Sequence, residues 1–284
     1  MALSSIPLRI KYQGGAADRN ELPGYDGATS IDGITRAIHI ATHAYMTGET
    51  VSRATALKGA QIFIRPARQG SFIFDLIVLM EAYPATSTAG VAVTAPVFYD
   101  FVKTAFRRAA GILDAEPEHP HLQKVYSRRQ PPNLAKPPAD LDILAETLEG
   151  SLQAAHRPIG DGDGIVTISV GSPRRDFITF DQETKDWVTT QDMSDRLEVL
   201  EGNVTRYNAL SRNGRAFIDS LDRVVPCRPD GDFPTADLGH LTWSLHGSNI
   251  GGRNKLNFRA RKVTSATGKV KRLLLADCSR APLE

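Results

Sequence analysis

The sequence predicts an α+β fold, in which an N-terminal β-α-β-β-α module is followed by a mainly β small barrel or sandwich. Two observations predict the first part: a strand pair within 59–81 is apolar on both faces, and amphipathic helical patterns precede and follow it. A third observation predicts the second part, because many short strand patterns separated by glycine turns follow residue 160.

The length of 284 residues suits one large domain or two small ones. We expect an N-terminal α+β module with a small-residue segment at 1–113, a proline-rich linker at 114–139, and a helix plus a mainly β module at 140–284. Six prolines between 117 and 138 exclude long regular structure from the linker, although 119–129 suits a short helix or a partner contact.

The first module begins with a strand and a helix. Residues 6–13 alternate between apolar and polar side chains, as in a half-buried strand. Thr29 or Ser30 can then cap a helix that ends near Gly48, with Ile31, Ile34 and Ile38 on its apolar face.

The strand pair within 59–81 comes next. Its return strand carries apolar side chains on both faces, interrupted by Asp75. Because strands that are apolar on both faces are usually buried on both, we expect this hairpin to be central and covered on each side.

The uncharged small-residue run at 82–99 has two interpretations. It can be a close-packed connection, or it can form an oligomer or membrane surface with the amphipathic helix that follows Pro96. A simple membrane span is disfavoured, because the run is shorter than about 20 residues and contains Pro84. The residues assigned to the oligomer or membrane surface are Ala85, Ala89, Gly90, Val93, Phe98 and Phe101.

Two short patterns resemble metal sites but are incomplete. His39 and His43 have the i, i+4 spacing that zinc sites use, yet no third ligand is evident. The Asp-Gly-Asp-Gly run at 161–164 lacks the downstream glutamate of a calcium loop. We assign no metal and no cofactor.

The second module is predicted to open with a helix at 140–156, capped by Asp140. Asn213-Gly214 between two alternating segments predicts a β-hairpin. The other short segments predicted as strands are 165–171, 176–180, 186–192, 241–249, 255–263 and 269–277.

Charge is unevenly distributed along this module. Residues 161–252 contain 9 basic and 15 acidic side chains, whereas residues 253–284 contain 9 basic and 2 acidic ones. A ribbon with one apolar and one basic face suits a phosphate backbone, although basic side chains also protect sheet edges from aggregation. The predicted nucleic-acid-binding residues are Arg253, Lys255, Arg259, Arg261, Lys262, Lys269, Lys271 and Arg272, with Trp187, Tyr207 and Trp243 available for base stacking.

Catalytic signatures are missing from the sequence. It contains no G-x-S-x-G, H-E-x-x-H or P-loop motif, and Cys227 and Cys278 have no metal-binding spacing. The start of the chain also lacks a signal-peptide pattern. We therefore expect a cytoplasmic binding protein rather than an enzyme, with an unrecognised hydrolase as an alternative.

Three stretches, LRIKYQGGAADRNELPGYDGATSIDGITRAIHIATHAY, ATALKGAQIFIRPARQGSF and YDFVKTAFRRAAG, resemble a group of uncharacterised bacterial proteins associated with anti-phage defence loci. The pattern is also similar to the channel-type effector of the Hailong defence system, which a DNA oligomer holds silent. The resemblance implies a tetramer, a groove for single-stranded DNA and membrane opening, but it assigns no residue a role.

These observations predict a non-enzymatic homo-oligomer that binds a single-stranded oligonucleotide or another anion through its basic C-terminal ribbon. The alternative is a membrane-acting effector that uses 82–110 and associates with the inner membrane.

Overall fold

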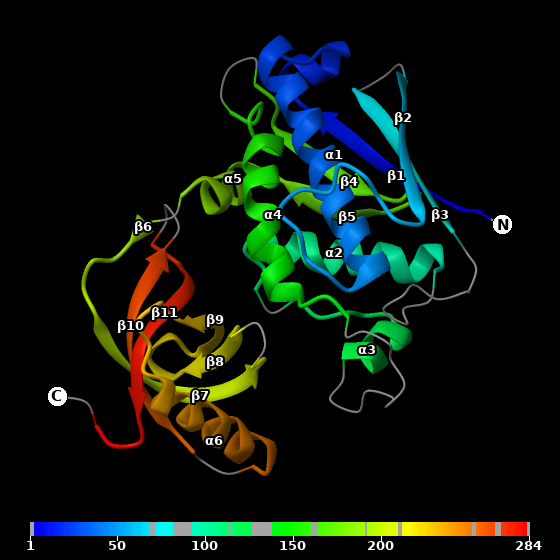
Figure 1. Ribbon diagram of the computed structural model, residues 1–284. Helices are drawn as coiled ribbons and strands as arrows, with labels where there is room; N and C mark the ends of the chain where they lie inside the picture. Colours follow the sequence, from blue (N-terminus) through cyan, green and yellow to red (C-terminus); the bar gives the residue numbers. More distant parts are fainter. Residues whose placement is uncertain are drawn as a thin grey trace. The chain divides into compact units, whose positions relative to one another are not determined.

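The computed structural model forms two compact units, Met1–Val188 and Thr189–Glu284, which we describe separately (Figure 1). It describes residues 3–68, 72–81, 93–113, 115–126, 138–160, 164–190, 192–209, 212–251, 254–264 and 268–282.

The first unit is built on a five-stranded antiparallel sheet with the strand order β2-β3-β1-β4-β5. Its strands are β1 (Leu3–Gln13), β2 (Ala60–Arg68), β3 (Ile73–Glu81), β4 (Thr167–Gly171) and β5 (Asp176–Phe180). On β1, Ile6, Leu8, Ile10 and Tyr12 are fully buried and the residues between them are not, so one face of the sheet carries the core.

Helices cover this apolar face (Figure 1). They are α1 (Gly24–Thr47), α2 (Ala95–Ala109) and α4 (Leu141–Ala155), with the short helices η1 (Gly15–Arg19), α3 (Pro120–Tyr126) and α5 (Gln182–Thr189) around them. As predicted, the carboxylate of Asp140 caps α4, accepting hydrogen bonds from the backbone N–H groups of Asp142 and Ile143.

The crossing of α1 and α4 is unusually close. A Cβ atom built on Gly33 would lie 2.5 Å from the backbone nitrogen of Ala155 and 2.6 Å from the carbonyl oxygen of Ser151. Ser30 donates a hydrogen bond to the Ala155 carbonyl at 2.5 Å and lies 2.9 Å from the Tyr12 hydroxyl. Ser30 is therefore a buried packing residue within α1 rather than its cap.

The expectation of a central, doubly covered hairpin is wrong for β2. This strand is at the edge of the sheet, and Phe63 and Ile64 are 51% and 55% exposed. The apolar pattern of β2 does not show whether the strand lies at the edge or in the centre of the sheet. Its position depends on how β1 and β4, which are far away in sequence, join the sheet.

The expected module boundary at 139 and 140 also differs from the structure. Helix α4 packs on α1 and α2, and β4 pairs with β1, so residues 140–188 complete the first unit. The proline-rich segment connects parts of one unit rather than two modules.

The second unit is a closed five-stranded barrel. Its strands are β7 (Glu198–Tyr207), β8 (Gly214–Ile218), β9 (Arg223–Pro229), β10 (Leu256–Thr264) and β11 (Val270–Ser279). They follow the order β11-β9-β8-β7-β10, and the pairing of β10 with β11 closes the ring. A two-residue strand, β6 (Asp192–Met193), extends the edge of β10.

Helix α6 (Leu238–Asn249) connects β9 to β10 and packs against β7, where the Ser244 hydroxyl accepts a hydrogen bond from the Val204 N–H at 3.0 Å. If β7 to β11 are numbered one to five, their order around the barrel is 1-2-3-5-4-1. Strands three and five are parallel, and helix α6 lies between strands three and four in the sequence. This is the connectivity of the OB-fold, a small Greek-key barrel.

The predicted fold class is therefore confirmed: the chain is α+β, and its mainly β part is a small barrel. Two segments predicted as strands, 186–192 and 241–249, are largely helical and belong to α5 and α6. In α6, Leu241, Ser244 and Gly247 face the barrel, so two of its three buried residues are too small or too polar to form an apolar stripe.

The 82–99 segment lies mostly outside the described residues. Among the residues that the structure describes, no helix combines the length and the apolar character needed to cross a membrane.

Candidate functional site

Strands β10 and β11 pair as the predicted ribbon, with Leu256, Phe258 and Ala260 buried in the barrel core. Their basic side chains, however, are largely engaged with acids of the same unit. Four of the predicted phosphate-binding residues form ion pairs: Lys255 with Asp219 and Glu201, Arg259 with Asp277, Arg261 with Asp230, and Lys262 with Glu198. The hydrogen bond to Asp219 raises the pKa of Lys255. Acids therefore neutralise much of this surface.

Lys271 was predicted to bind nucleic acid beside Arg259 and Arg261, but it does not lie on the exposed face of the ribbon, so that prediction is wrong. It is 2% exposed, and its Nζ lies 3.3 Å from the Thr190 carbonyl oxygen. The register jumps here, because Val263 is opposite Arg272 whereas Thr264 is opposite Val270. Lys271 is the extra residue of this bulge, which turns its side chain inward.

The remaining predicted ligands are dispersed. Lys269 is exposed in the turn before β11, Arg272 is half-buried on β11, and Arg253 lies outside the described residues. The predicted set is thus not one continuous basic surface.

A second basic surface, which the sequence analysis missed, lies on the outer side of β8 and β9. Ala216 and Ile218 of β8 and Val225 and Cys227 of β9 are buried in the barrel core. Because side chains alternate along a strand, the residues between them point outward.

The strand register brings arginines from different strands together on this outer side. Arg206 of β7 is opposite Arg215 of β8, and Arg215 is opposite Pro226 of β9. The parallel register of β9 and β11 places Arg272 beside Pro226, and Arg228 follows on the same face of β9. We call this surface the arginine face, which comprises Arg206, Arg215, Phe217, Arg228 and Arg272.

The side chains of the arginine face differ in exposure. Arg228 is exposed, Arg206, Phe217 and Arg272 are half-buried, and Arg215 is buried at the centre of the row. No Asp or Glu occurs in the four strand stretches that form this face: 203–207, 214–218, 223–229 and 270–276. Arginines and a lysine are therefore the charged side chains of these four stretches.

The net charge of sequence segments does not reveal the arginine face. Arg206, Arg215 and Arg228 lie in segment 161–252, whose net charge is negative. The structure confirms the predicted hairpin, but Asn213-Gly214 is not its turn, because Gly214 begins β8 and pairs with Tyr207. A turn at Asn213-Gly214 would place Arg212 opposite Arg215, so the sequence signal did not give the observed pairing of Arg206 with Arg215.

The three aromatic residues suggested for base stacking have other positions. Trp187 is buried in the first unit, and Tyr207 packs partly against the barrel core. The guanidinium of Arg280 lies 4.4 Å from the ring centroid of Trp243. Phe217 is instead the aromatic side chain of the arginine face.

Three residues of the predicted oligomer or membrane surface lie in the core of the first unit. Val93, Phe98 and Phe101 are 5%, 0% and 2% exposed and belong to the core of the first unit, so their assignment to an outer surface is wrong. Tyr45 packs against both phenylalanine rings, at 5.1 and 5.2 Å between centroids. Ala85, Ala89 and Gly90 lie outside the described residues.

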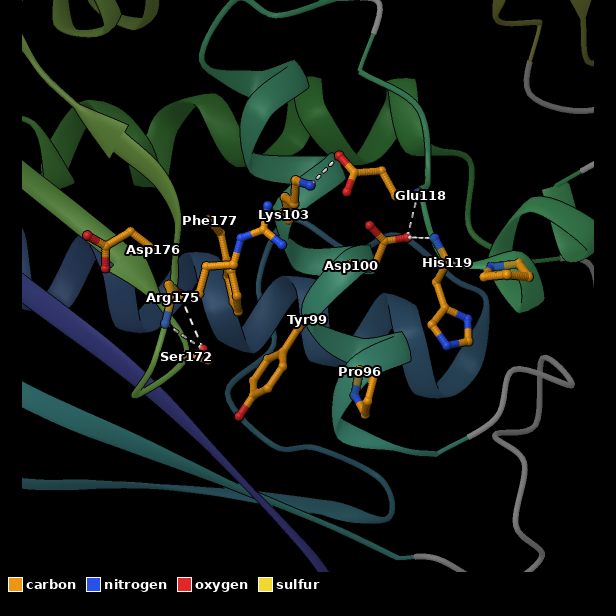
Figure 2. Close-up of a pocket in the computed structure, with 11 residues that line it drawn as sticks. Pro96, Tyr99, Asp100, Lys103, Glu118, His119, Ser172, Arg175, Asp176 and Phe177 are labelled. Atoms are coloured by element: carbon orange, nitrogen blue, oxygen red, sulfur yellow. Dashed lines mark hydrogen bonds and ion pairs between the residues drawn. The ribbon is translucent and has the colours of Figure 1, made fainter.

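A cavity of about 400 Å³ lies in the first unit between α2, the segment before α3 and the β4–β5 turn (Figure 2). Tyr99, Phe177 and Pro96 provide its apolar wall. Lys103, Arg175 and Glu118 provide its charges, and the hydrogen bond from Lys103 holds the pKa of Glu118 below its usual value.

His39 of the histidine pair contacts the backbone. His39 Nδ1 lies 2.9 Å from the Ala54 carbonyl oxygen, and its side chain lines another cavity of about 450 Å³. Among the described residues, no group of three or more His, Cys, Asp or Glu side chains is placed to hold a metal ion.

Comparison with known proteins gives one match. A family model described as a domain of unknown function (DUF7946) matches residues 8–189, which correspond to nearly all of the first unit and leave the barrel outside. No curated protein and no solved structure matches the chain significantly.

Proposed function

The chain belongs to the family of the domain of unknown function DUF7946, and because this membership assigns no activity, we propose from the barrel's own residues that the protein binds single-stranded nucleic acid. The observation that carries the proposal is the arginine face. It brings four guanidinium groups together on strands whose contributing stretches contain no acid.

Guanidinium groups suit phosphate because their planar N–H donors can form two parallel hydrogen bonds to one phosphate group. Arg206, Arg228 and Arg272 come from three different strands and are not buried, so a ligand that crosses the strands can contact them in succession. Such a row follows the repeating charge of a nucleic-acid backbone better than an isolated cation does.

The aromatic ring of Phe217 supports a single strand rather than a duplex. Phe217 lies two residues beyond Arg215 on the same outer face of β8. Stacking of an unpaired base on an aromatic ring contributes about 1–3 kcal/mol and requires no particular base.

Fold-level analogy points to the same surface. OB-folds bind oligonucleotides and oligosaccharides on their second and third strands, which here are β8 and β9. Analogy alone does not assign a function, but the concentration of arginine favours an anionic polymer over a neutral sugar.

The proposal can be tested with two variants of equal charge change. Arg206, Arg228 and Arg272 are replaced by Gln in the first, and Lys255, Arg259 and Lys262 in the second. Binding of a fluorescein-labelled oligothymidylate is measured by fluorescence anisotropy at several salt concentrations.

We expect the first variant to bind at least about tenfold more weakly, with a logarithmic salt slope shallower by about 2, because three phosphate contacts are lost. The second variant should stay within about twofold of wild type, because its cations are already paired with acids. Equal effects of the two variants would mean that only net charge matters, and absence of wild-type binding would refute the proposal.

The expected homo-oligomer and the role in anti-phage defence stay predictions beside this proposal. Sedimentation of the full chain with and without the oligonucleotide tests the first of them.

A further inference from the structure

The cavity in Figure 2 plays no part in the proposed nucleic-acid binding, because all of its lining residues belong to the first unit. Its volume of about 400 Å³ lies within the usual range for small-molecule sites. Three segments that are distant in sequence form its walls, around residues 96–103, 118–120 and 172–177.

One wall of the cavity is aromatic. The rings of Tyr99 and Phe177 lie 5.1 Å apart between centroids and are tilted by 49°. The Tyr99 hydroxyl donates a hydrogen bond of 2.7 Å to the Pro7 carbonyl, which fixes its ring. Two half-buried and mutually packed rings can hold a flat aromatic group by stacking or edge contacts.

The charged wall is built around Glu118. Lys103 donates a hydrogen bond to this carboxylate, and Arg107 Nη1 lies 3.9 Å from it. Lys103, Arg107 and Arg175 all lower the pKa of Glu118, with Lys103 contributing most. One carboxylate therefore occupies a position that three cations favour.

The two side chains of the Lys103–Glu118 ion pair differ in solvent exposure, which distinguishes it from a pair that is fixed on both sides. The Lys103 side chain is 14% exposed, whereas the Glu118 side chain is 60% exposed. The cation is thus held by the protein, and its carboxylate partner can turn into solvent at little cost.

Asp100 anchors the backbone that carries Glu118. Its carboxylate accepts hydrogen bonds from the N–H groups of Glu118 at 2.9 Å and His119 at 2.8 Å. The segment can therefore stay in place when the Glu118 side chain leaves. In Figure 2, Asp176, the remaining acid of the lining, lies on the other side of Arg175 from Lys103.

We propose that this cavity binds a nucleoside monophosphate, with its base against Tyr99 and Phe177 and its phosphate on Lys103 and Arg175 in place of the Glu118 carboxylate. Phosphate suits the site because it carries more charge than the carboxylate that it replaces, and because arginine and lysine together satisfy its oxygens. This proposal is independent of nucleic-acid binding by the barrel.

Isothermal titration calorimetry of the full chain with AMP and UMP tests the proposal. Adenosine and inorganic phosphate, each carrying half of the ligand, should bind at least about tenfold more weakly than AMP, because each uses only one wall. Lys103→Met should weaken AMP binding at least about tenfold, because it removes the buried cation.

Glu118→Gln should strengthen AMP binding by about threefold or more, because the competing internal anion is removed while the side-chain shape is retained. An ion pair with a purely structural role would not produce this opposite effect. Because Glu118 is largely exposed, this variant also tests the proposal if Lys103→Met fails to fold.

Two controls locate the binding. Arg36→Met, in the other cavity of the first unit, should leave AMP affinity unchanged. The variant with Gln at 206, 228 and 272 should also bind AMP normally, which separates this site from the arginine face. No binding of AMP or UMP at millimolar concentration, or equal affinity of wild type and the two pocket variants, would overturn the proposal.

Discussion

His156 is a fully buried residue, and its burial determines its protonation state. Its Nδ1 donates to the Leu152 carbonyl at 2.6 Å, and its Nε2 lies 3.0 Å from the Thr184 hydroxyl oxygen. Burial is the main reason that the pKa of His156 is lowered to about 4, and Lys185 also lowers it. The Leu152 hydrogen bond and the Asp181 carboxylate raise this pKa, but their effects are smaller. The imidazole is therefore neutral at pH 7.

This pKa predicts how the stability of the first unit depends on pH. The unfolded chain protonates His156 near pH 6.5, whereas the folded chain protonates it only near pH 4. The part of the free energy of unfolding that depends on neutral His156 therefore has its full value above pH 6.5, and it is lost as the pH falls toward 4. Between pH 7.5 and pH 5 the loss should be about 2 kcal/mol, and His156→Gln should remove it.

Urea unfolding measures this effect in a Trp243→Phe background, where Trp187 is the single tryptophan and reports on the first unit. The exposed His246 of the barrel provides the control, because His246→Gln should leave the pH dependence of that transition unchanged. The assignment to His156 fails if the Gln variant loses stability between these pH values as steeply as the parent.

Residue roles were predictable from the sequence only where they depend on nearby positions. Asp140 could be assigned as a helix cap because its partners follow within three residues. Lys255 and Arg261 could not be placed correctly, since Asp219 and Asp230 approach them only after the barrel closes. A charge balance computed along the chain does not contain that information.

At the scale of elements, the contact between α1 and α4 depends on Gly33. Gly33→Ala should destabilise the first unit by about 1–3 kcal/mol, because the new methyl group meets backbone atoms that cannot rotate away. The higher helix propensity of alanine offsets only about 1 kcal/mol of this cost. Separation of the helices would also disturb the Ser30 hydrogen bond to Ala155.

Gly150→Ala on α4 provides a matched control, because nothing lies within 4 Å of its added Cβ. It should stabilise the same unit by about 0.5–1 kcal/mol through helix propensity. Opposite signs in urea unfolding support the packing explanation, and stabilisation by both substitutions would show that the crossing can relax.

Periodicity predicted most elements correctly where one face of an element is continuously apolar, as in β1, α2 and α4. It failed for α6 and α5, for different reasons. Helix α6 buries the small or polar Ser244 and Gly247. Helix α5 has only 8 residues, and its buried residues, Trp187 and Val188, are adjacent in sequence and show no helical spacing. Both segments contain short apolar alternations that also suit strands.

The whole molecule combines parts in an order that the sequence does not reveal. Strand β1 pairs with β4, more than 150 residues later in the chain, so the first unit closes only after the proline-rich segment and α4. The cavity in Figure 2 arises from the same closure, because Lys103 and Arg175 come from parts that the sequence assigns to separate modules. The barrel, by contrast, is continuous from Thr189 onward and has its own core.

This continuity leads to a prediction for the isolated barrel. Residues 189–284 expressed alone should fold and unfold cooperatively, because the closed sheet leaves few strand edges unpaired and all residues of its apolar cluster lie within this range.

The isolated barrel should also bind the same oligothymidylate with the affinity and salt slope of the full chain, since the arginine face lies entirely within residues 189–284. Residues 1–188 should show no such binding. Anisotropy titration of both fragments decides the matter: strong binding by residues 1–188, or a folded barrel that does not bind, would move the nucleic-acid site away from β8 and β9.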